Sequence, residues 1–145
     1  MSKLLKRAKV QMHLANECYI HFADDDSFID GCCYCVQQVI ELTLKYIVEM
    51  QGENYAENHD LRSNLNILDR IGFNVPCKGQ IRQMASTLYS WQTESRYKDS
   101  FVALKADIDD AMKVAAELLL LADSLTSQEN VSESASYPNE HLNNQ

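Results

Sequence analysis

The sequence predicts an all-α protein, an up-and-down bundle of four or five helices. Three observations lead to this prediction. Apolar residues recur in steps of three and four, no segment alternates polar and apolar residues as a strand does, and only two prolines and four glycines occur among 145 residues. A chain of this length usually forms one domain with its own core. We therefore expect one helical domain with short connections.

The first two helices are predicted from two apolar stripes. The first helix is expected over about Ser2 to Ala23. The run from Asp24 to Ser27 breaks its stripe and offers carboxylates to the positive end of the next helix dipole. The second helix then spans about Ser27 to Gln51, and Gly52 ends it as a C-terminal glycine does. The stripes are Leu5, Ala8, Met12, Ala15, Tyr19 and Phe22, then Phe28, Cys32, Cys35, Val39, Leu42, Tyr46 and Met50.

The third helix is predicted from its caps. Asn58 is expected as the N-cap, with Asp60 and Leu61 in the first turn. Leucines three and four apart provide a buried face, and Gly72 and Pro76 end the helix and begin a loop.

Two more helices are expected over residues 79–91 and 100–125, each with an apolar stripe. After Thr126 the composition changes to serine, glutamate, asparagine and glutamine, with almost nothing to bury. We therefore expect a helical bundle over residues 1–126 and a flexible polar tail over residues 127–145.

Composition and charge argue against several classes of protein. The formal net charge of −8 repels phosphate backbones, so a non-specific nucleic-acid binder is not expected. The four cations Lys3, Lys6, Arg7 and Lys9 are interpreted as a solvated face. No apolar run follows them as in a secretory signal, and the longest apolar run is too short for a bilayer. We expect a soluble cytoplasmic protein without a membrane segment.

The five cysteines do not predict a disulfide framework, because their number is odd and no export signal precedes them. Cys32 and Cys35 would lie one turn apart on an apolar stripe. A tetrahedral zinc site needs further ligands that nothing here supplies. We interpret these cysteines as small core residues and expect no metal and no cofactor.

Three polar groups are candidates for a site. Gln38, Glu41 and Lys45 form a line beside the apolar stripe of the second helix, in which Glu41 and Lys45 are a favourable i,i+4 pair. His59 and Asp60 begin the third helix. Metal-dependent hydrolases also carry a His-Asp pair, but no other histidine and aspartate here has a recognisable matching spacing.

The third candidate group is aromatic and basic. Trp91, Arg96 and Tyr97 lie at the end of the fourth helix, where an arginine can hold an anion and a ring can stack on a base. The alternative is a loop whose aromatic residues fold onto the bundle.

Three segments together resemble the HEPN domain family. They read YCVQQVIELTLKYIVEMQG, NHDLRSNL and LYSWQTESRY, and their order and spacing agree with that family over about residues 4 to 125. The resemblance implies a helical bundle, often a homodimer, with proposed nucleotide or nucleic-acid binding in a polar cleft. Some relatives pair with a minimal nucleotidyltransferase in a toxin–antitoxin-like arrangement, and others are ribonucleases. The ligand-binding residues that we expect are Gln38, Glu41, Lys45, His59, Asp60, Trp91, Arg96 and Tyr97.

The sequence departs from the ribonuclease branch of this family, which places a histidine four to six residues after an arginine near the later helices. No histidine follows Arg96 before His141, and the pair Arg7 and His13 lies on the first helix, where the family does not place that motif. We therefore expect a non-catalytic binding module with no catalytic residues. The alternatives are a ribonuclease toxin with a non-standard site and a structural partner protein without a ligand.

Dimerisation would need an exposed apolar patch. Five apolar residues lie off the predicted stripes and are expected to form one. They are Tyr34, Ile40, Ile47, Tyr89 and Val102.

Overall fold

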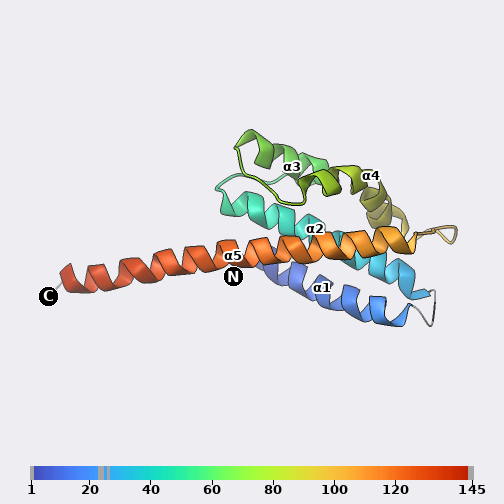
Figure 1. Cartoon of the computed structure of the whole chain (residues 1–145), viewed down its shortest axis with the longest axis horizontal. Coiled ribbons are helices and arrows are strands. Elements are labelled where there is room, and N and C mark those ends of the chain that lie inside the picture. The colour runs from blue at the N-terminus through green and yellow to red at the C-terminus, as the bar shows by residue number, and fades with distance from the viewer. Residues whose placement is uncertain (1, 23–24, 26, 144–145) are drawn as a thin grey trace.

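The computed structural model describes residues 2–22, 25 and 27–143, with side chains up to residue 131. These residues form five helices and no strand, which confirms the predicted all-α class. The helices are α1 (Lys3–His21), α2 (Ser27–Met50), α3 (Leu61–Arg70), α4 (Lys78–Glu94) and α5 (Lys105–Asn143). Figure 1 shows α3 and α4 on one side of α2, α1 on the other side and α5 alongside.

α2 is the central helix, because each of the other four helices packs against it. Every residue from Cys35 to Val48 is buried, so the helix is covered all round and not along one stripe only. The predicted dimer patch is therefore wrong in part. Ile40 and Ile47 lie in the core, where α2 has no exposed side to present.

Glycines end two helices as predicted. Gly52 and Gly72 both have a φ of 77°, in the left-handed region that favours glycine. The amide of Gly52 donates to the Glu49 carbonyl, and the next amide reaches back to Val48 at 3.2 Å. Gly72 makes the same pair of bonds at the end of α3, so both turns satisfy carbonyls that the helix leaves free.

The start of α2 also follows the prediction. The carboxylate of Asp25 accepts a hydrogen bond from the Ser27 amide at 2.9 Å, and this bond lowers the pKa of Asp25. Asp24, Asp26 and the predicted end of the first helix at Ala23 lie outside the described residues.

α5 is longer than predicted. It begins at Lys105 and continues as helix to Asn143, beyond the expected end at Leu125, and Figure 1 shows this segment extending past the other helices. The expected tail was inferred from a lack of residues to bury. A helix is held by local hydrogen bonds, so its backbone can continue where that burial ends. The division into a bundle over residues 1–126 and a flexible tail over residues 127–145 stays a prediction.

None of the helices that the structure describes combines the length and apolar character needed to cross a bilayer.

Candidate functional site

A chain of polar side chains runs along buried positions of α2. Gln38 donates to Gln37 at 2.8 Å, and Gln37 donates to Oε1 of Glu41 at 3.1 Å. The Lys45 ammonium lies 3.4 Å from Oε2 of the same carboxylate. A buried carboxylate is costly unless donors satisfy it, and Glu41 is only 5% exposed. The predicted line of Gln38, Glu41 and Lys45 is therefore one network, extended by Gln37.

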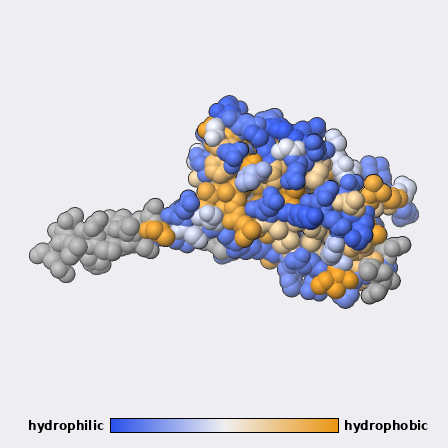
Figure 2. Space-filling model, in the orientation of Figure 1, coloured by the Kyte–Doolittle hydropathy of each residue, from blue (hydrophilic) through white to orange (hydrophobic). Residues whose placement is uncertain are grey.

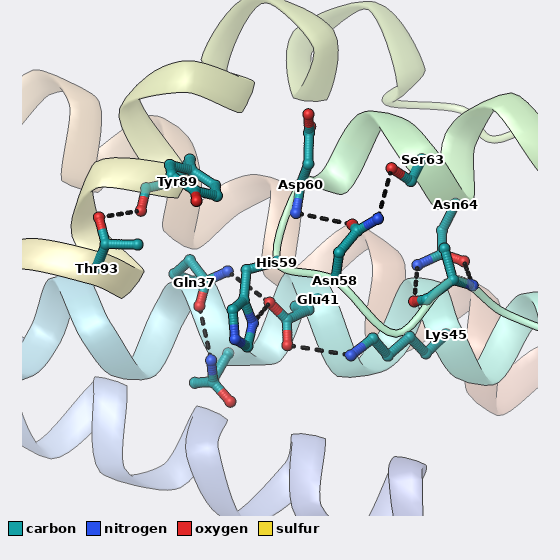
Figure 3. Close-up of polar contacts among 12 residues, drawn as sticks. Gln37, Glu41, Lys45, Asn58, His59, Asp60, Ser63, Asn64, Tyr89 and Thr93 are labelled. Carbon is teal, nitrogen blue, oxygen red and sulfur yellow. Dashed lines mark hydrogen bonds and ion pairs between the residues drawn. The ribbon is translucent and has the colours of Figure 1, made fainter.

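His59 joins this network from the loop before α3. Its Nδ1 lies 2.9 Å from Oε1 of Glu41, and its side chain is 48% exposed. An ionised carboxylate can only accept, so Nδ1 is assigned as the donor and Nε2 is the ring nitrogen left for another partner. Figure 3 shows the ring between the loop and α2, directed at Glu41.

The loop is shaped by capping bonds that differ from the prediction. Asp60, not Asn58, is the N-cap of α3, because its Oδ1 accepts from the Arg62 amide at 3.0 Å. Asn58 supports the preceding turn: its Oδ1 accepts from the Asp60 amide, and its Nδ2 donates to Ser63. These bonds set His59 one residue before the N-cap of α3.

Asp60 does not face the network, which corrects the expectation that it joins His59 in a cleft. Its two oxygens lie 2.9 and 3.1 Å from the Arg62 guanidinium, and this pairing lowers the pKa of the carboxyl. Figure 3 shows the carboxylate pointing away from Glu41. His59 and Asp60 point in different directions from this turn. His59 therefore contacts Glu41, whereas Asp60 caps α3.

A hollow of about 370 Å³ lies over the network, and we call it the central hollow. It contains four of the predicted residues, which come from α2 and from the loop before α3. Its wall also includes residues of α1 and α4. The lining residues are Leu4, Arg7, Tyr34, Gln38, Glu41, Leu42, Lys45, Tyr55, Glu57, His59 and Gln92.

Sequence reasoning missed several residues of this wall. Arg7 is exposed, as expected of a solvated face, but it also lines the hollow, and it makes no ion pair within the described residues. His13, six residues after Arg7, is exposed and does not line the hollow. The Lys45 ammonium lies over the Tyr55 ring, with Nζ 5.7 Å from the ring centroid.

The aromatic and basic group at the end of α4 is divided by the fold. Trp91 is only 1% exposed and belongs to the core, so the expectation that it stacks on a base is wrong. The Arg96 guanidinium lies 4.0 Å from the Tyr34 ring centroid and 5.0 Å from that of Tyr97. Because Tyr34 lines the hollow, Arg96 contacts a residue of its wall without lining the hollow itself. Tyr97 lies outside the wall.

The cysteines of α2 lie in the core. Burial raises the pKa of Cys32 to about 12 and that of Cys35 to about 11, and it also raises the pKa of Cys33. Metal ligation and nucleophilic attack both need the thiolate, which this environment disfavours.

Comparison with known proteins identifies one family, described as the HEPN domain, which matches residues 1–125. No curated protein and no solved structure matches the chain. The matched range contains every residue that lines the central hollow.

Proposed function

We propose that this chain, which belongs to the HEPN domain family, is a helical binding module whose central hollow takes a nucleotide. The observation that supports this is the meeting of Arg7, Lys45 and His59, from three separate segments, in one hollow with two tyrosine rings. Cations provide charge-assisted hydrogen bonds to phosphate, and aromatic rings stack on bases. The volume of about 370 Å³ is within the usual range for ligand pockets.

The two cations Arg7 and Lys45 of the hollow differ in whether a carboxylate already pairs with them. Lys45 is partly neutralised by Glu41, whereas Arg7 has no such partner among the described residues. Arg7 is therefore assigned to the phosphate. Tyr34 already has Arg96 on one side of its ring, which holds the ring in place for stacking on a base.

Arg7→Ala is expected to weaken AMP binding by about tenfold to a hundredfold, the loss that one charge-assisted hydrogen bond predicts. Calorimetric titration with AMP measures this loss. Lys6→Ala is the matched control, because Lys6 is a neighbouring exposed cation of α1 that does not line the hollow. Equal weakening in both variants, or no binding of AMP, ADP, ATP or GMP at millimolar concentration, would contradict the proposal.

A second candidate is a ribonuclease with a non-standard site, favoured by the 2.9 Å contact between Glu41 and His59. A carboxylate that orients Nδ1 leaves Nε2 as a general base. In this candidate mechanism Nε2 of His59 takes the proton of a ribose 2′-hydroxyl while that oxygen attacks phosphorus. The 5′-oxygen would then leave and take a proton from water.

This candidate predicts RNA cleavage that His59→Ala abolishes and His59→Gln does not restore, because glutamine keeps the polarity without the basic nitrogen. Gel analysis of RNA incubated with the purified protein measures cleavage, and expression in bacteria should arrest growth. Intact RNA with the unmodified protein, or cleavage that survives His59→Ala, would remove the candidate.

Family membership also supports a proposed homodimer and a minimal nucleotidyltransferase as partner in a toxin–antitoxin-like system. The third hypothesis is a partner protein without a ligand, in which the polar network only stabilises the fold. Co-purification with the product of the adjacent gene tests the partnership, and light scattering at micromolar concentration tests the dimer.

A further inference from the structure

A second hollow lies at one end of the bundle, away from the residues of the central hollow. It lies between the start of α2 and the loop of residues 95–104, and its volume is about 230 Å³. We call it the end hollow. It is lined by Ile29, Asp30, Phe101, Val102 and Ala103.

Apolar side chains surround the end hollow without covering it. Val102 is 81% exposed and Leu104 is 66% exposed, and Phe28 is also exposed beside Ile29. Figure 2 shows hydrophobic residues among hydrophilic ones at the end of the bundle where the loop after α4 lies. Adjacent exposed apolar residues of this kind are typical of interaction surfaces.

Asp30 is the one charged residue among the described residues that line the end hollow, and it gives the hollow a negative charge. Asp30 makes no ion pair among the described residues, and burial raises the pKa of its carboxyl. Two nearby lysines are engaged elsewhere: Lys98 with Glu94 at 2.9 Å and Lys105 with Asp109 at 3.0 Å. A partly desolvated carboxylate in an apolar hollow favours a ligand whose cationic side chain is flanked by apolar side chains.

We propose that the end hollow is a docking surface for a basic, apolar segment of another protein. An arginine or lysine of that segment meets Asp30, and apolar side chains beside it cover Val102 and Leu104. Charge complementarity decides the kind of partner, because the hollow offers a carboxylate and the chain has a net charge of −8. Apolar contact would supply the remaining binding free energy.

A short amidated peptide of leucine and arginine, labelled with fluorescein, is the probe. Its arginine-to-glutamate counterpart is the matched peptide. With the full chain, we expect the arginine peptide to shift the amide resonances of residues 28–30 and 101–104. Asp30→Asn should weaken binding by about tenfold in fluorescence anisotropy, and Val102→Ser should weaken it too. Glu53→Gln, the same loss of charge in the turn after α2, should leave the affinity unchanged.

Four results of the peptide titrations would overturn the proposal. They are no binding, equal binding of the glutamate peptide, equal weakening by Asp30→Asn and Glu53→Gln, and amide shifts spread over the acidic surface. Self-association that protects the same residues would instead assign the surface to a second copy of the chain and would also overturn it. Circular dichroism of each variant separates a loss of fold from a loss of binding.

Discussion

Trp91→Ala is expected to lower the free energy of unfolding by about 3–5 kcal/mol, the usual cost of removing a large aromatic side chain from a core. The indole is 1% exposed and packs in the main apolar cluster with residues of the other helices. The substitution would leave a cavity that the surrounding helices cannot fill completely. Urea denaturation followed by far-ultraviolet circular dichroism measures the change.

Trp91→Phe is the control for this prediction. Phenylalanine keeps an aromatic ring in the core, so the expected loss of stability is clearly smaller than that of the alanine variant. AMP affinity should be the same in Trp91→Phe as in the unmodified protein. A stable Trp91→Ala variant that no longer binds AMP would show that the indole contacts the ligand.

Glu41→Gln is expected to destabilise the fold by about 3 kcal/mol, the lower end of the cost of breaking a buried ion pair. The substitution leaves the Lys45 ammonium, only 11% exposed, without its carboxylate. The lower end applies because the amine opens onto the central hollow, where water can reach it. Lys45→Met is expected to cost less, about 1–2 kcal/mol, because Gln37 and His59 still contact Glu41.

The double variant Glu41→Gln/Lys45→Met decides whether the two groups act as a unit. We expect it to cost less than the sum of the single variants by about 1–2 kcal/mol, since neither charge is then left alone. Urea denaturation of the four proteins gives this coupling free energy. Strict additivity would mean that the 3.4 Å contact contributes nothing to the fold.

The affinity of Arg7→Ala for AMP, and not the coupling free energy, separates the two hypotheses for the central hollow. A network that only holds the helices together predicts coupling between Glu41 and Lys45 and no effect of Arg7→Ala on any ligand. A binding site predicts the same coupling together with loss of AMP affinity in Arg7→Ala. Arg7 distinguishes the two because it lines the hollow without an ion pair among the described residues.

Much of the fold could be predicted because it depends on bonds between residues close in sequence. Gly52 and Gly72 end α2 and α3 because each turn needs a positive φ, which glycine adopts without strain. The spacing of Gln38, Glu41 and Lys45 places them along one helix in any context. That spacing was enough to predict the polar line at the base of the central hollow.

The remainder was decided by the tertiary structure. The packing of α1 beside α2 brings Arg7 into the hollow. The packing of α4 against α2 covers the stripe of α4 that ends at Trp91. The carboxylate of Asp60 accepts the capping bond from the Arg62 amide, so it is not directed into the hollow. This bond depends on the geometry of the loop, which the sequence does not show. Local hydrogen bonds determine where a helix begins and ends, so the sequence by itself predicted the elements. Which side chains from different helices meet depends on how the helices pack, which only the tertiary structure decides.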